Sequence, residues 1–95
     1  MMFHSAETDA LFEAIISINN VEECAKFFED ICTVKELQDL SQRFQVAKLL
    51  KSGKSYQEIS GVTGASTATI SRVNRSLVYG SGGYLSVLSK LEENK

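Results

Sequence analysis

The stretch from Ser55 to Leu77, SYQEISGVTGASTATISRVNRSL, constrains this chain more than any other. Ser55 is followed three residues later by Glu58, a capping box that begins a helix. Gly64 then marks a turn, because only glycine enters left-handed backbone space without strain. The stretch therefore predicts two short helices joined by a tight turn.

The second of these helices combines an apolar face with an opposite face that is small, hydroxylated or basic. Ser66 can cap it, and its apolar residues Ile70, Val73 and Leu77 recur at spacings of three and four. Its other faces carry Thr67, Ala68, Thr69, Ser71, Arg72 and Arg75. A solvated helix normally carries Glu and Lys there, so this face suits a polar, negative partner. We predict a DNA-reading helix-turn-helix over about residues 55–78.

The rest of the chain also reads as helical, so the expected fold class is all-α with about six helices. Proline is absent, and Val, Ile and Thr form no long alternating run. Asn20 with Glu23, and Thr33 with Glu36, are further capping boxes, and Gly53 ends a long helix. Besides the two short helices, the expected helices span residues 5–19, 21–31, 34–51 and 84–93.

The length of the chain, 95 residues, suits one helical domain over residues 1–95. Its three N-terminal helices are apolar over wider faces than one small domain can cover by itself. A homodimer that interlocks these helices is the economical solution. Such a dimer would present two copies of the turn, as a two-fold symmetric DNA site requires.

The net charge of −2 hides a strong division along the chain. Residues 1–42 hold two lysines against nine acidic residues, a net −7. Residues 43–80 hold six basic residues against Glu58 alone, a net +5, and residues 81–95 are balanced. The positive charge is therefore concentrated around the predicted turn, where contacts to DNA phosphates would be made.

Cysteine and hydropathy patterns exclude several other classes. Cys24 and Cys32 would lie about 12 Å apart on one helix, too far for a disulfide, so we expect both to be small core residues. With His4 as the only histidine, no metal site is expected. No segment approaches the roughly 20 apolar residues that span a bilayer, and the N-terminus does not resemble a signal peptide. We expect a cytoplasmic protein.

The run GASTATISRVNRSL, preceded by SYQEI, resembles the helix-turn-helix of the Trp repressor family. The resemblance extends upstream through TVKELQDLSQRFQVAKLLKSGKS, covers roughly residues 10–92, and looks closest to the Trp-repressor-like branch of uncharacterised proteins in Gram-positive bacteria. It implies an intertwined homodimer of six-helix subunits that regulates transcription. It also implies that the start of the second short helix enters the major groove.

The predicted DNA contacts follow from this docking. Ser66, Thr67, Ala68 and Ser71 would lie near base edges or phosphates, and Arg72 would contact DNA as well. Lys48, Lys51, Lys54 and Arg75 are candidates for sequence-independent phosphate contacts. The family's basic residues on the first short helix are replaced here by Gln57 and Ser60, so operator choice is expected to differ.

The resemblance also carries over a corepressor site, whose positions correspond here to Thr33, Arg43, Arg72 and Ser76. Two guanidinium groups suit a small aromatic or anionic effector. Val73 stands where the family has a glycine, so tryptophan itself is not the expected effector. Each residue also has a simpler interpretation. Thr33 would cap a helix and Arg43 would pair with Asp39. Arg72 would contact a DNA phosphate, and Ser76 would be an ordinary surface residue.

An alternative hypothesis is a protein-interaction module, whose acidic half docks a basic partner while the helix-turn-helix is kept as a folding unit. An enzyme is not expected. The sequence has no nucleophile–base pair, no metal cluster and no phosphate-binding glycine loop. Catalytic residues and a metal are therefore not predicted.

Overall fold

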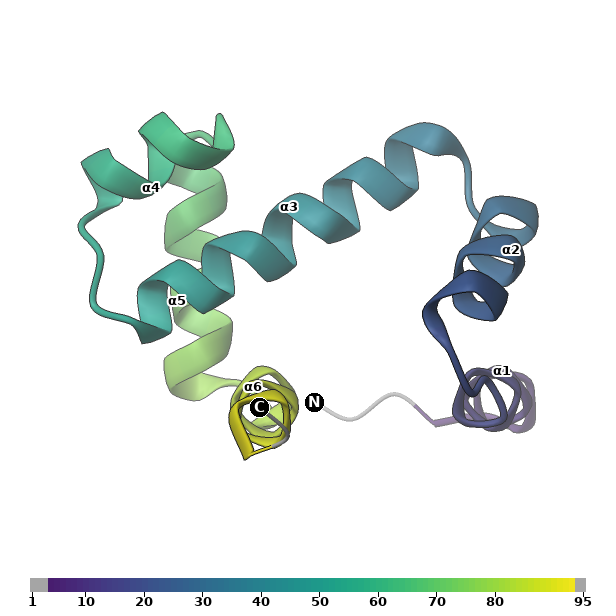
Figure 1. Cartoon of the computed structure of the whole chain (residues 1–95). Helices are drawn as coiled ribbons and strands as arrows, with labels where there is room; N and C mark the ends of the chain where they lie inside the picture. The colour runs from purple at the N-terminus through teal and green to yellow at the C-terminus, as the bar shows by residue number, and fades with distance from the viewer. Residues whose placement is uncertain (1–3, 94–95) are drawn as a thin grey trace. The chain divides into compact units, whose positions relative to one another are not determined.

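The computed structural model describes residues 4–93, and this part of the chain contains six α-helices and no strand (Figure 1). The expected all-α class is confirmed. The helices are α1 Ala6–Ile16, α2 Val21–Ile31, α3 Val34–Lys51, α4 Tyr56–Thr63, α5 Thr67–Tyr79 and α6 Gly83–Glu93. None of them is long and apolar enough to cross a membrane.

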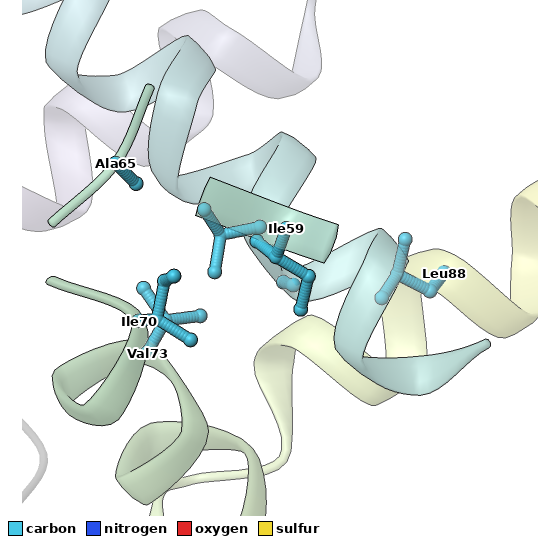
Figure 2. Close-up of a cluster of buried hydrophobic side chains, with 7 residues drawn as sticks. Ile59, Ala65, Ile70, Val73 and Leu88 are labelled. Carbon is cyan, nitrogen blue, oxygen red and sulfur yellow. The ribbon is translucent and has the colours of Figure 1, made fainter. Parts of the chain in front are cut away.

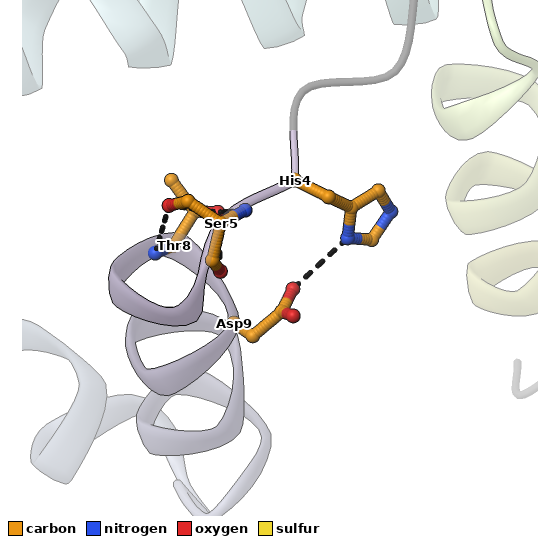
Figure 3. A network of polar contacts seen from close by, with 4 residues as sticks. All are labelled: His4, Ser5, Thr8 and Asp9. Atoms are coloured by element: carbon orange, nitrogen blue, oxygen red, sulfur yellow. Dashed lines mark hydrogen bonds and ion pairs between the residues drawn. The ribbon is translucent and has the colours of Figure 1, made fainter.

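The first helix is shorter than the expected 5–19. It ends at Ile16 because the Ser17 hydroxyl donates to the Ala14 carbonyl at 2.6 Å, which satisfies a carbonyl the next turn would have used. Asn20 must also be extended, at φ −152° and ψ 167°, to cap α2. At the other end, Ser5 and Thr8 form a reciprocal cap, and His4 Nδ1 lies 3.0 Å from Asp9 Oδ1 (Figure 3).

Caps are present at the later predicted positions, although Asn20 and Glu23 form only one of the two bonds of the predicted capping box. The Glu23 N–H donates to Asn20 Oδ1 at 2.8 Å. Thr33 and Glu36 exchange hydrogen bonds of 2.8 and 3.1 Å, and Ser55 and Glu58 exchange two of 3.1 Å. Hydrogen bonds from the main-chain N–H of Thr33 and of Ser55 lower the pKa of Glu36 and of Glu58, respectively, since they stabilise the ionised carboxylate.

The long helix α3 ends in a Schellman motif, as Gly53 suggested. Gly53 has φ +85°, its N–H donates to the Leu50 carbonyl, and the Lys54 N–H donates to the Leu49 carbonyl. This closure satisfies two of the last carbonyls of α3 and redirects the chain toward the cap of α4.

The chain forms two compact units, divided after Gln38. In the first unit, no residue of α1 or α2 is buried. The rings of Phe27 and Phe28 pack edge to face with centroids 5.6 Å apart. Cys24 and Cys32 are free and half-buried. Several large apolar side chains are exposed in this unit: Phe12, Ile16, Val21, Ile31 and Val34.

The second unit, from Asp39 onward, contains the buried core. Figure 2 shows side chains from α4, the turn, α5 and α6 directed into a common interior. The core consists of Val46, Ala47, Ile59, Ala65, Ile70, Val73 and Leu88, each at most 4% exposed. Phe44, Leu49, Leu50, Leu77 and Tyr84 pack around it. The apolar positions expected of both short helices therefore face inward, which leaves their polar faces outside.

Two glycines of this unit should respond oppositely to alanine. Gly64 has φ +74°, so Gly64→Ala should cost about 1 kcal/mol of folding free energy. Gly61 lies within α4, and a Cβ there meets no atom within 4 Å. Gly61→Ala should therefore stabilise by about 0.5–1 kcal/mol. Thermal unfolding followed by circular dichroism measures both, and equal melting temperatures for the two variants would contradict the assigned turn.

Candidate nucleic-acid interface

The turn between α4 and α5 is closed by three short-range hydrogen bonds. The Gly64 N–H donates to the Ser60 carbonyl at 2.9 Å. The Thr63 hydroxyl donates to the Ile59 carbonyl at 2.7 Å and accepts from the Ala65 N–H at 3.1 Å. Because Ala65 is only 2% exposed, the turn is held to the core as well as to α4.

Ser66 begins α5 as predicted. Its hydroxyl accepts the Thr69 N–H at 3.1 Å and donates to Thr69 Oγ1 at the same distance. A serine hydroxyl has a single proton to donate, and here the cap uses it. With this cap formed, Ser66 keeps acceptor capacity only, so a phosphate at the start of α5 would be met by backbone N–H groups of the first turn.

The remaining predicted contact residues of α5 are all exposed: Thr67, Ala68, Ser71, Arg72 and Arg75. No Asp or Glu occurs in α5. The opposite face of this helix supplies Ile70 and Val73 to the core. The result is one outward helical surface with hydroxyl, methyl and guanidinium groups and no negative charge.

The basic side chains beside this surface are not equivalent. Lys54 is exposed next to the cap of α4. Lys51 as a whole residue is also exposed. Its ammonium group, however, lies 3.0 Å from Glu92 Oε1 on α6. A phosphate would compete with this carboxylate for Lys51. The sequence could not reveal the pair, because 41 residues separate its members.

A cavity of about 210 Å³ lies between α3 and α5 within the second unit. Its lining includes Arg43 and Arg72, which the sequence assigned to the same small-molecule site, together with Asp39, Gln42 and Thr69. It is smaller than the roughly 300–1,000 Å³ typical of pockets for drug-sized ligands. Two guanidinium groups and one carboxylate suit a small anion or zwitterion.

The other two residues of that predicted site lie elsewhere. Ser76 lines a separate, mainly apolar hollow of about 600 Å³ with Phe44, Tyr84 and Val87. Thr33 belongs to the first unit, where it caps α3. Val73, expected to intrude into the pocket, is 2% exposed in the core and does not line the cavity between the two arginines.

Sequence reasoning missed Gln42 and Thr69 as lining residues of this cavity. A helical-spacing signal was available for Thr69, because it precedes Arg72 by three positions on α5 and therefore shares its face. Gln42 carries no such signal. Within residues 4–93, no group of His, Cys, Asp and Glu side chains gathers as a metal site.

The fold and this exposed helix define an all-helical protein built around a helix-turn-helix. Comparison with known proteins shows which family it belongs to. The family of the Trp repressor protein matches residues 6–92. The uncharacterised protein YerC of Bacillus subtilis (strain 168) is 48% identical over 89 residues, which cover 94% of this chain and 86% of that protein.

Two solved structures are similar along nearly the whole chain. A candidate Trp repressor from Staphylococcus aureus has a TM-score of 0.91 and 52% identity, covering 94% of this chain and 89% of that one. A TrpR-like protein from Eubacterium eligens ATCC 27750 has a TM-score of 0.90 and 51% identity, covering 93% and 91%. The chain belongs to the Trp repressor family, whose members are transcription regulators and not enzymes.

Proposed function

We propose that this chain is a sequence-specific DNA-binding transcription regulator that acts as a homodimer. The observation that carries the proposal is the outward face of α5. It presents Thr67, Ala68 and Ser71 with Arg72 and Arg75, while the helix is fixed from behind by buried Ile70 and Val73. Hydroxyl and methyl groups contact base edges, and guanidinium groups contact bases or phosphates.

The electrostatics of the second unit support this docking. Arg72, Arg75 and Lys54 are exposed around the turn, and the one acid of α4, Glu58, is engaged by Ser55. Each phosphate contact releases condensed counterions, so binding should weaken steeply as salt rises. Lys51 contributes less than its charge suggests, because Glu92 already holds its ammonium.

The apolar faces of the first unit support the dimer. Within one chain, Ile16 remains 79% exposed, Val21 86% and Val34 75%. An unpaired surface of this kind marks an interaction site in a protein that is otherwise soluble. A second copy of the chain covers such a surface and also doubles the helix-turn-helix.

The cavity that includes Arg43 and Arg72 supports control by a small anionic or zwitterionic effector. Arg72 belongs both to the cavity and to the outward face of α5. A bound carboxylate that pairs with its guanidinium would therefore alter one of the groups that approach DNA.

Genomic occupancy mapping followed by binding to a recovered site tests the DNA proposal. Arg75→Gln should lower affinity and reduce the slope of log K against log salt by about 0.9, as loss of one phosphate contact requires. Lys90→Gln removes the same charge from an exposed position on α6 and should leave both the affinity and the slope unchanged. Absence of occupancy and of salt-dependent binding would contradict the proposal. Repeating the DNA-binding measurement in the presence of tryptophan tests whether this zwitterion is the effector.

Sedimentation equilibrium tests the dimer, and the wild type should have twice the mass of one chain. Phe12→Asp places a charge among the exposed apolar side chains of α1 and should raise the dimer dissociation constant by at least tenfold. Val62→Asp, on α4 and 69% exposed, is the matched control and should leave it unchanged. A monomeric wild type would favour the interaction module instead.

A further inference from the structure

One side-chain hydrogen bond joins the interior of the second unit's α3 segment to the end of α4. Gln42 Nε2 donates to the main-chain carbonyl of Thr63 at 3.2 Å, across 21 residues of sequence. Thr63 is the last residue of α4, so its carbonyl has no intrahelical partner and requires one from outside. The Gln42 side chain is half-buried, which shields this bond from water.

Thr63 also forms the hydrogen bonds that close the turn. Its hydroxyl bridges the Ile59 carbonyl and the Ala65 N–H, at 2.7 and 3.1 Å. Ile59 is fully buried and Ala65 nearly so. The residue that Gln42 holds is therefore the one that closes the turn, and α5 begins two residues beyond Ala65.

Gln42 also lines the cavity between α3 and α5, together with Arg72 and Thr69 of α5. One side chain thus contacts the end of the first short helix and borders the second. Ser66 and Thr69 are committed to the cap of α5, and the turn's own bonds are local. Gln42 supplies a long-range polar bond from α3 to the helix-turn-helix, in addition to the packing of the core.

We infer that Gln42 is a positioning residue for DNA recognition, an inference that rests on the proposed function. Base contacts require α5 to be held in register with base edges, whereas phosphate contacts tolerate small rotations. Loss of the Gln42 donor leaves the Thr63 carbonyl to water and loosens the end of α4. The loss should therefore weaken specific binding more than non-specific binding.

The test uses Gln42→Met, which keeps the length of the side chain and removes the donor. Gln45→Met is the matched control, since Gln45 is exposed on the same helix. Affinity is measured for a recovered site and for unrelated duplex DNA. Gln42→Met should lower specific affinity by up to about fivefold and leave non-specific affinity unchanged, because re-ordering the loosened turn on a specific site costs at most what one hydrogen bond contributes. Gln45→Met should match the wild type for both.

Amide hydrogen exchange in the free protein provides a readout that does not depend on DNA. The Gly64 and Ala65 N–H groups should exchange faster in Gln42→Met, while the core amides of α3 keep their protection. Gln42→Asn keeps the amide but shortens its reach by one methylene, and it should give the same result if the methionine variant does not fold.

Unchanged exchange at the turn together with unchanged specific affinity would overturn the inference. Equal losses of specific and non-specific affinity would also overturn it, because they indicate general destabilisation. If the wild type binds no DNA, the proposed function fails, and so does the role of Gln42 in recognition. Exchange at Gly64 and Ala65 would still report separately whether Gln42 fixes the turn.

Discussion

Burial of a few branched side chains under the turn holds the helix-turn-helix of this protein together. Val46 of α3, Ile59 of α4, and Ile70 and Val73 of α5 are each at most 2% exposed. A fully buried aliphatic side chain of this size stabilises a fold by about 1.5–3 kcal/mol. Because these side chains fix which faces of α4 and α5 point inward, they also determine which faces remain for DNA.

The two compact units divide the chemistry as well as the packing. Seven of the twelve acidic residues lie in α1 and α2, in which no residue is buried within one chain. Most of the basic residues follow Gln38, in the unit that contains the core. The exposed apolar surface is therefore concentrated in one unit, and most of the positive charge in the other.

Features set by near neighbours could be predicted from the sequence. The capping bonds of Ser55 and of Thr33 reach only three residues along the chain, and the inward positions of α5 follow the helical period. The end of α1 was predicted three residues late, because helical periodicity continued past Ile16 while Ser17 satisfied a carbonyl locally. The wide apolar faces predicted that one chain cannot cover its N-terminal helices, and no residue of α1 or α2 is buried within it.

The candidate site depended more on tertiary contacts and was predicted only in part. Arg43 and Arg72 do share a cavity, but Ser76 lines another hollow and Val73 faces the core. The bonds from Gln42 to Thr63 and from Lys51 to Glu92 join distant parts of the sequence, and no local pattern encodes them. The first bond adds a long-range contact to a turn that local bonds and the core already hold, and the second pairs Lys51 with a carboxylate.

DNA binding through the helix-turn-helix is tested most directly by titrating isotopically labelled protein with duplex DNA and following the amide chemical shifts. The largest changes in chemical shift should fall at the turn and the first half of α5, around Thr67, Ala68 and Ser71. Changes confined to α1 and α2, or none at low salt, would contradict it.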